Sequence, residues 1–336
     1  MRYKRINPSV RLSKRFGVFQ GNLSRQKKIL KSCSLCKPYQ FEMASVNDVV
    51  LTLTFSLLSL TDFVGNISVC LIILQRKRFR FRRLTLDYLF VNLALADITV
   101  AVFAIPRYVL NHAFVHPLGS FGDFLCRFVT GGNLMWTGGA ASVFTLVTIA
   151  FERRHASRPY QVGQRLSKPK LRVLVLSSWI FACLLNLPLF VIMSYDSGSN
   201  FCIENWPHPL LPKVYGIIWI SVVGVIPIAI MVVLYSEVVY RLWGKTRVAR
   251  LNRGSLLIPR KATRIAVTLT VIYSICWLPN LILYILVFNI SYILYGSPLY
   301  GWTVVLTCLN STVNPFVYTL QSRRFRASAK RALLCK

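Results

Sequence analysis

Acidic residues are scarce in this chain: ten Asp and Glu stand against 41 Lys and Arg among 336 residues. Charged residues of both signs make up 15% of the sequence, whereas hydrophobic residues make up 54%. Because soluble domains usually carry about 25% charged residues, the composition excludes an ordinary soluble globule. A net charge of +31 would suggest nucleic-acid binding in a soluble chain. Here the bases gather between long apolar runs, so we expect no nucleic-acid partner.

Groups for catalysis or metal binding are also lacking. The four histidines show no metal-ligand spacing and lie in or near loops, where we interpret them as solvated: His112, His116, His155 and His208. The nine cysteines are odd in number and scattered, so they form no disulfide framework or zinc pattern. Cys33 and Cys36 form a CxxC without a partner pair nearby. We therefore expect no enzyme, no catalytic residue and no organic cofactor.

Seven apolar runs follow one another along the chain: 48–74, 84–110, 124–151, 171–194, 212–240, 264–288 and 298–320. A membrane helix needs about 20 apolar residues to cross the hydrocarbon core. The runs therefore predict an all-α membrane protein with a bundle of seven transmembrane helices. Polar residues within them should face the bundle interior, because lipid offers them no hydrogen bond: Asp62, Asn66, Asp97 and Glu237.

The third run predicts the central helix of this bundle. It has no acid or base between Arg127 and Glu152, and it is rich in Gly, Ala and Ser. Small residues let neighbouring helices approach closely. We therefore expect this helix to be surrounded on all sides.

The loops between the runs predict the orientation. Segments 75–83, 153–172, 241–264 and 322–336 carry six, seven, eight and six bases, and the alternate loops carry almost none. Basic loops face the cytoplasm. We expect a multi-pass plasma-membrane protein with its amino terminus outside and its carboxyl terminus inside.

Both ends of the chain differ from the bundle. Residues 1–42 carry 11 bases and one acid, and we interpret them as a disordered leader outside the mature protein, since those bases oppose translocation. We assign residues 43–321 to the bundle and 322–336 to a short amphipathic helix and tail. That helix should lie on membrane lipid. Cys335 beside it is either palmitoylated or a free thiol.

Landmark residues in every run resemble the rhodopsin-like (class A) family of G-protein-coupled receptors. They comprise Gly65-Asn66, Asn92 to Asp97, Ser142, Glu152-Arg153, Trp179, Pro188, Pro227, Tyr235, Cys276 to Pro279, Asn310-Ser311 and Asn314 to Tyr318. One such motif would be weak, but the whole set occurs in order. The resemblance implies a receptor that couples an outer ligand to heterotrimeric G proteins.

The resemblance also implies two sets of functional residues. The first surrounds Asp97 and would bind an allosteric sodium ion, although a purely structural hydrogen-bond cluster is the alternative: Asp97, Ser142, Asn310, Ser311 and Asn314. The second would couple helix movement to the G protein: Glu152, Arg153, Tyr235, Trp277, Pro279, Asn314, Pro315 and Tyr318. The two prolines favour kinks, and a kink beside Trp277 gives a hinge.

Four departures from the family pattern stand out. Arg154 replaces the usual tyrosine, and no acid near Pro259 is placed to lock Arg153. Tyr273 stands where most members have phenylalanine. Cys126 lies 27 residues before Arg153, about two more than usual, and we expect a bulge in the glycine-rich region 131–139 to absorb the excess.

Two classes of ligand are excluded because the pocket region lacks the residues that would bind them. The upper third span has no aspartate for an amine, and the seventh span has no lysine for a retinal Schiff base. The stretch 201–207 (FCIENWP) resembles receptors of the tachykinin, neuropeptide Y and RFamide group. We therefore expect a cationic or amidated peptide, contacting Met135, Trp136, Glu204, Trp277, Tyr284 and Trp302. There are two alternatives. The chain could be a receptor for a lipid or other small non-amine ligand, or it could be a receptor-like membrane protein that does not signal.

Two further expectations concern the outer face and the tail. Cys126 and Cys202 should form a disulfide, since both lie at the oxidising outer face. The tail offers only Ser322 and Ser328 for phosphorylation. Arrestins read phosphate charge, so we expect weak arrestin binding.

Overall fold

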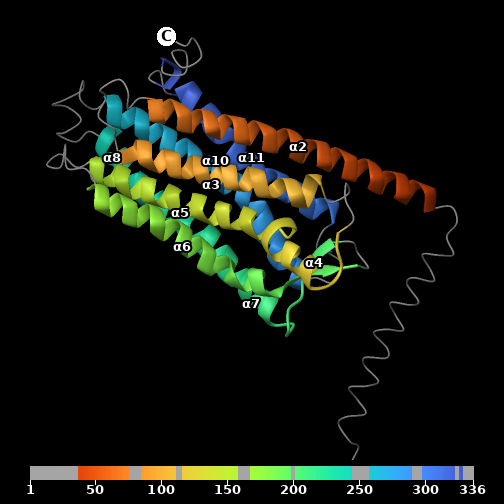
Figure 1. Cartoon of the computed structure of the whole chain (residues 1–336). Helices are drawn as coiled ribbons and strands as arrows, with labels where there is room; N and C mark the ends of the chain where they lie inside the picture. The colour runs from red at the N-terminus through yellow and green to blue at the C-terminus, as the bar shows by residue number, and fades with distance from the viewer. Residues whose placement is uncertain are drawn as a thin grey trace, which may run out of the picture. The chain divides into compact units, whose positions relative to one another are not determined.

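A computed structural model describes residues 37–75, 85–110, 116–157, 167–197, 201–243, 257–289, 297–321 and 325–327 (Figure 1). By contacts the chain divides into two compact units, Met1–Val50 and Leu51–Lys336, and the second contains the helical bundle. Within the leader, only residues from Lys37 onward are described, where α2 begins.

Helices make up almost all of the described chain. They are α2 (Lys37–Gln75), α3 (Thr85–Ala104), α4 (Gly119–Leu125), α5 (Asn133–Ala156), α6 (Lys168–Ile192), α7 (Leu211–Trp219), α8 (Ile226–Trp243), α10 (Leu257–Asn289) and α11 (Pro298–Gln321). Three π-helical segments extend or join them: Ile105–Val109, Cys126–Thr130 and Ile220–Val225. Strands β1 (Met193–Asp196) and β2 (Phe201–Glu204) form an antiparallel hairpin in which Tyr195 pairs with Cys202.

Each of the seven predicted spans corresponds to a helix or a continuous helical segment. Six of these are long and apolar enough to cross a membrane: Val46–Gln75, Leu86–Val109, Gly119–Ala156, Pro169–Ile192, Leu211–Leu242 and Arg260–Asn289. The seventh, α11, has 24 residues and so reaches about 36 Å. It is more polar because its buried face carries Asn310, Ser311 and Asn314.

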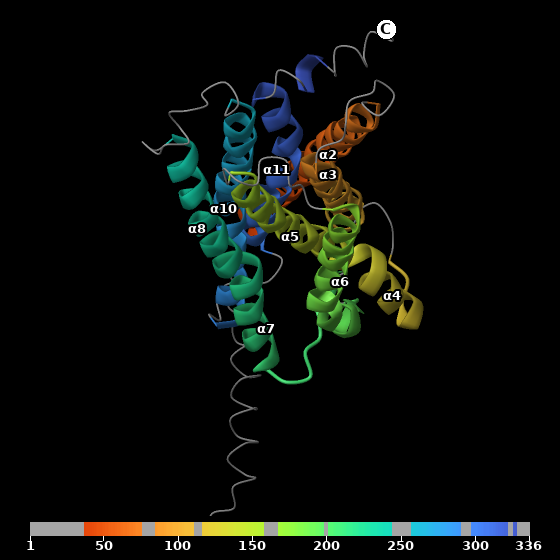
Figure 2. The ribbon, with the colours of Figure 1, turned by 90° about the vertical axis from the view of Figure 1, so that its left-hand side faces the viewer.

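Helix α5 is the central helix, as its small residues predict. It packs against α3, α6, α8 and α10 (Figure 2). A Cβ atom at Gly138 would lie 2.8 Å from the Ala96 carbonyl oxygen of α3. One at Gly139 would lie 2.6 Å from the Trp277 ring of α10. Only glycine fits at these two positions, so they set how closely α3 and α10 approach α5.

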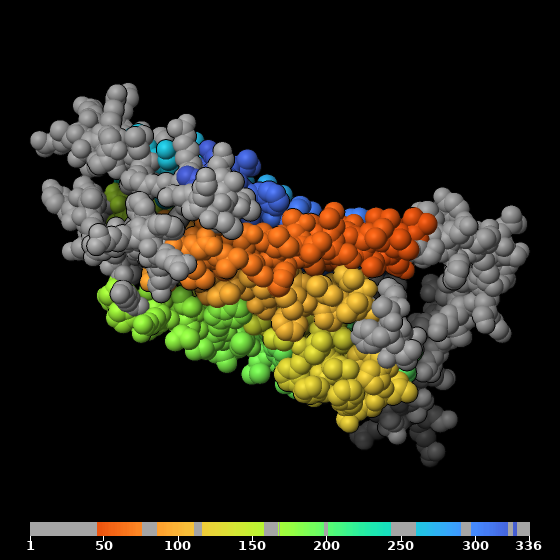
Figure 3. Space-filling model, turned by 45° about the horizontal axis from the view of Figure 1, so that its top comes forward, coloured from red at the N-terminus to blue at the C-terminus, as the bar shows by residue number. Residues whose placement is uncertain are grey.

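The outward surface is apolar and the interior holds the polar groups. On α6 the exposed side chains recur at helical spacing: Val173, Leu176, Ile180, Leu184, Leu187 and Val191. Figure 3 shows part of this surface, to which α2 (orange) and α6 (green) both contribute. Asp62, Asn66 and Asp97, by contrast, are at most 1% exposed. This inversion of the soluble pattern is what a lipid solvent requires.

A buried polar network joins α3, α5 and α6. The Asn92 amide donates to Thr145 Oγ1 (2.8 Å) and to Ser178 Oγ (3.2 Å). Its oxygen accepts the Trp179 indole N–H at 3.1 Å. Such bonds between spanning helices are each worth about 0.6 kcal/mol. The network therefore positions α3 and α6 against the central helix α5.

Candidate functional site

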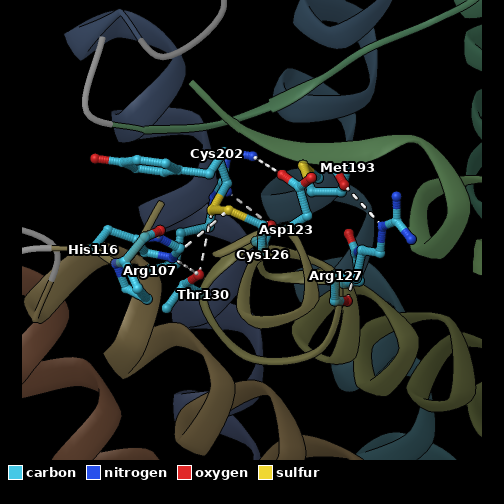
Figure 4. The surroundings of a disulfide bond; sticks show 12 residues. Arg107, His116, Asp123, Cys126, Arg127, Thr130, Met193 and Cys202 are labelled. Atoms are coloured by element: carbon cyan, nitrogen blue, oxygen red, sulfur yellow. Dashed lines mark hydrogen bonds between the residues drawn. A yellow bond between two sulfur atoms is a disulfide. The ribbon is translucent and has the colours of Figure 1, made fainter. Parts of the chain in front are cut away.

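We call the end of the bundle with β1 and β2 the hairpin end, and the end with Glu152 and Arg153 the arginine end. At the hairpin end a disulfide joins Cys126 to Cys202, with a Cα–Cα distance of 5.6 Å (Figure 4). This confirms the predicted bond. Asp123 Oδ1 accepts the Tyr195 backbone N–H at 2.9 Å, and Arg127 Nε donates to the Met193 carbonyl at 3.2 Å. The hairpin is thereby held onto the start of the central span from both strands.

His116 corrects our interpretation of the histidines as solvated. It is 7% exposed and stacks on the Tyr195 ring with centroids 4.2 Å apart. Its Nε2 lies 3.0 Å from Thr130 Oγ1 and 3.8 Å from Cys126 Sγ (Figure 4). His116, Cys126 and Cys202 lie close enough to suggest a metal site. The two sulfurs, however, are bonded to each other and are not thiolate ligands, so His116 packs the disulfide.

The third span is irregular, but mostly before the region 131–139 in which we expected a bulge. Residues Cys126–Thr130 are π-helical, and Gly132 has a φ of 82°, which favours glycine. Arg107, near the end of the second predicted span, is 3% exposed and donates to the Gly131 carbonyl at 2.8 Å. Its guanidinium also lies over the Phe201 ring, 4.4 Å from the centroid. The irregular backbone is thus bound by a buried cation.

Below the hairpin lies a cluster of aromatic side chains from α5, α7 and α10, with Trp206 above it. Trp136 makes edge contacts with Trp219 (6.4 Å) and Trp277 (6.2 Å), and Tyr215 contacts Trp206 (5.4 Å) and Tyr284 (6.4 Å). Glu204 Oε2 accepts the Trp206 indole N–H at 2.8 Å and the Tyr284 hydroxyl at 3.0 Å. Glu204 therefore connects the hairpin to α10 as well as to its own loop.

Deeper in the bundle, Asp97 is fully buried among polar groups. Asn314 Nδ2 donates to its Oδ2 at 2.6 Å, and Ser142 Oγ to its Oδ1 at 3.3 Å. Ser311 is a third hydrogen-bonding neighbour of this carboxyl group. Asn310 is buried on α11, but no hydrogen bond joins it to Asp97 within the described residues. The structure thus brings together four of the five residues of the predicted set.

The surroundings of Tyr273 explain why a tyrosine stands where most family members have phenylalanine. It is fully buried beside Trp277, and its hydroxyl donates to the Val223 carbonyl. Pro227 lacks an N–H and so cannot donate to that carbonyl, which lies four residues before it. The tyrosine hydroxyl supplies the missing donor and links α10 to the irregular turn before α8.

At the arginine end, Arg153 is 8% exposed and pairs with Glu152, its Nε lying 2.6 Å from Oε2. Arg154 forms an ion pair with Glu237 of α8, and Glu237 also pairs with Arg241. Arg260 of α10 donates to the Leu242 carbonyl at the end of α8, at 2.8 Å. Among the described residues, these contacts join α5 to α8 and α8 to α10. None of them uses an acid on α10, in agreement with the absence of an acid near Pro259.

Comparison with known proteins decides the family. The model of the 7 transmembrane receptor (rhodopsin family) matches residues 65–318. The chain belongs to this receptor family. It is therefore a multi-pass membrane protein of the plasma membrane, and its family is one of receptors and not of enzymes.

Individual relatives agree with this assignment. The receptor is 25% identical to the tachykinin-like peptides receptor 86C of Drosophila melanogaster, over 94% of this chain and 64% of that protein. It is 28% identical to neuropeptide receptor 22 of Caenorhabditis elegans, over 82% and 67%. It is 30% identical to the mouse neuromedin-K receptor, over 87% and 65%. The chain thus spans about two thirds of the length of these relatives.

One predicted pocket residue is misplaced. Met135, Trp136, Trp277 and Tyr284 are all at most 8% exposed and lie in the interior. Trp302 is 39% exposed and lies 18 residues, or five helical turns, before the exposed Leu320 of α11. It therefore faces outward, and we withdraw it from the candidate pocket.

Some residues of the candidate site escaped the sequence analysis. Tyr215 and Trp219 complete the aromatic cluster, and the pair Arg154–Glu237 joins two helices. Aromatic spacing along 211–219 was the only available signal for the first two. Cys335 and most of the predicted tail helix lie outside the described residues. Phe325 of that segment is buried against Tyr318, with centroids 6.1 Å apart.

Replacing Tyr273 with phenylalanine should destabilise the receptor by about 1–3 kcal/mol, because the buried Val223 carbonyl would lose its donor. The thermal unfolding midpoint of the purified protein measures this. Tyr240→Phe is the matched control, since Tyr240 is 69% exposed on α8 and its loss of a hydroxyl should cost nothing. Equal midpoints for Tyr273→Phe and wild type would show that the hydroxyl contributes nothing.

Proposed function

We propose that this receptor transmits the binding of an extracellular neuropeptide to heterotrimeric G proteins. The observation that carries the proposal is one connected arrangement within α5 and its neighbours. A disulfide-tied hairpin lies over an aromatic cluster, and that cluster reaches Trp277, which touches the central helix that carries Arg153 in its last turn. Relatives named for tachykinin-like peptides and for neuromedin K support a peptide as the ligand.

The hairpin end faces the cell exterior in this proposal. A disulfide at that end is expected in an oxidising compartment. Most bases of the loops fall in segments at the other end, as positive-inside topology requires. The amino terminus is then outside and the carboxyl terminus inside.

Signal transmission uses the hinge in α10. Pro279 and Pro315 lie inside α10 and α11 and remove backbone hydrogen bonds there. A peptide group pressing on the aromatic cluster would shift Trp277 and, through a hinge at Pro279, the part of α10 at the arginine end. Arg153 would leave Glu152 and enter the G-protein contact, with Tyr235 and Tyr318 moving toward it.

The surroundings of Asp97 fit an allosteric sodium ion. A fully buried carboxylate with two serine hydroxyls beside it offers the oxygen ligands that hard cations prefer. Asn314 donates its amide N–H to the same carboxylate and would turn its amide oxygen to the ion. Asp97, Ser142, Ser311 and Asn314 would hold the ion, and its charge would stabilise the resting arrangement. Asn310 is left out of this set because it is not bonded to Asp97.

The peptide should present an arginine to Glu204 and an amidated aromatic end to the cluster below it. A guanidinium binds a carboxylate through two hydrogen bonds, and aromatic side chains are common anchors of interfaces. Glu204→Gln should weaken an arginine-containing agonist at least tenfold, because charge-assisted hydrogen bonds are worth about 1.5–3 kcal/mol. The variant keeps an acceptor for Trp206 and Tyr284.

A double-mutant cycle measures this contact. Binding of the agonist and of its Arg-to-Ala analogue is compared between wild type and Glu204→Gln. Asp196→Asn, on the same hairpin, is the matched control and should leave both affinities unchanged. A coupling energy near zero would place the peptide arginine elsewhere.

A screen of amidated peptides on cells expressing the receptor, with calcium and cyclic-AMP readouts, tests the proposed function. We expect responses to a small set of arginine-containing peptides and none to acidic ones. Responses to lipids alone would replace the peptide proposal by the alternative ligand class.

A further inference from the structure

The central span is longer than a membrane requires. The helical stretch Gly119–Ala156 has 38 residues and so measures about 57 Å, against a hydrocarbon core of about 30 Å. The 24 uncharged residues between Arg127 and Glu152 already cover about 36 Å. Helix α4, which precedes Arg127, therefore lies at or beyond the edge of the hydrocarbon core at the hairpin end.

The exposed side of this additional segment is apolar. Phe121, Phe124 and Phe128 recur at helical spacing and are 61%, 52% and 42% exposed. Leu118, which precedes them, is 71% exposed, whereas Gly122 on the opposite side is buried. Contiguous apolar side chains of this size are unfavourable in water and mark a surface that another molecule covers.

The charged side chains of the segment are directed toward the hairpin. Residues 118–128 include one acid and one base, Asp123 and Arg127. Asp123 Oδ1 accepts the Tyr195 backbone N–H at 2.9 Å, and Arg127 Nε donates to the Met193 carbonyl at 3.2 Å (Figure 4). Both charges are therefore used in holding the hairpin, and the outward face of the segment is left apolar.

This apolar face continues the exposed apolar surface of α6. The Phe128 ring contacts Phe124, with centroids 5.0 Å apart, and Phe190 of α6, with centroids 5.5 Å apart. Phe190 is followed by Val191, the last of the exposed apolar side chains of α6, at 63% exposure. Figure 3 shows α4 (yellow) and α6 (green) on the same face of the molecule. Lipid that covers the end of α6 is therefore in reach of α4.

We propose that the face formed by Leu118, Phe121, Phe124 and Phe128 inserts into the phospholipid layer at the hairpin end. Helical segments with Phe and Leu on one face bind at the boundary between headgroups and acyl chains. Continuity with the surface of α6 favours lipid over a second copy of the chain as the cover. Because Asp123 and Arg127 bond the hairpin, this contact also holds the hairpin at a fixed height above the membrane.

Fluorescence of the variant Phe121→Trp in lipid nanodiscs tests this, recorded as the difference from the wild type with its seven tryptophans. Phosphatidylcholine brominated on its acyl chains quenches a tryptophan that lies among them, and iodide in the buffer quenches one that lies in water. We expect the added tryptophan to lose most of its emission in brominated nanodiscs and to be insensitive to iodide. Leu118→Trp, at the other end of the same face, should behave alike and decides the question if Phe121→Trp fails to fold.

Two further variants calibrate the measurement. Ile180→Trp places the probe on the apolar surface of α6, where Ile180 is 59% exposed, and reports full contact with lipid. His208→Trp places it at an exposed position before α7 and reports contact with water. An added tryptophan at position 121 that follows the His208→Trp pattern would show that the face lies in water. One that neither reagent quenches would show that protein covers it, as in a dimer of this chain. Either result would overturn the insertion into lipid.

Discussion

Arg153→Ala should reduce agonist-stimulated nucleotide exchange roughly 30-fold or more while leaving peptide binding within a few-fold of wild type. In the structure Arg153 is buried and paired with Glu152, so its charge is already stripped of much of its water. In the active complex it would enter the G-protein interface, where truncating one partner of a buried charged contact costs about 2–5 kcal/mol. The aromatic cluster lies at the hairpin end, far from the substitution.

The neighbouring residue supplies the control. Arg154→Ala makes the same change one position along the chain, but Arg154 pairs with Glu237 instead of Glu152. We expect this variant to keep its coupling and to show a higher basal rate, because a bond between α5 and α8 is lost. Undiminished exchange in a well-expressed Arg153→Ala receptor, measured as guanine-nucleotide uptake in membranes, would remove Arg153 from the coupling mechanism.

Cys202→Ser should abolish peptide binding at the cell surface, or lower the affinity beyond detection. The disulfide joins two cysteines that are 76 positions apart in the sequence. It fixes strand β2, and with it Glu204, over the aromatic cluster. Removing such a bond typically costs about 2–4 kcal/mol, and the loop would also have to be reordered for each binding event. Binding of labelled peptide to intact cells measures the effect.

Two further variants make this result specific. Cys126→Ser combined with Cys202→Ser should be no worse than either single change, since both remove one bond. Cys183→Ser changes an exposed free cysteine of α6 and should bind as wild type. Normal peptide affinity in Cys202→Ser would show that the hairpin keeps its place without the disulfide.

The number and order of the helices could be predicted because a membrane imposes length and polarity on every span. Asp97 is an example: an acid within an apolar run has to lie inside the bundle, and it does. Trp302 shows the limit of this reasoning. A tryptophan is compatible with the lipid face and with the core face of a spanning helix, so its residue type carries no signal of which face it occupies.

Contacts between distant residues could not be predicted for a different reason. Arg107 is a base near the end of a predicted span and His116 looks like a loop residue in the sequence, yet each is buried by a partner far along the chain. The pair Arg154–Glu237 bridges 83 positions. The sequence shows that Tyr273 departs from the family pattern. Its role, however, depends on its hydrogen bond to the Val223 carbonyl, to which Pro227 cannot donate. These features become visible only once the helices are packed.

The central claim is that a peptide bound at the hairpin end drives nucleotide exchange at the arginine end. The most direct measurement is guanine-nucleotide exchange by the purified receptor in nanodiscs, with purified heterotrimeric G proteins of each main class and an amidated, arginine-containing peptide shown to bind. We predict that the peptide accelerates exchange on at least one G protein with wild-type receptor and on none with Arg153→Ala. A peptide that saturates the wild-type receptor yet leaves the exchange rate of every G protein at its basal value would contradict the account.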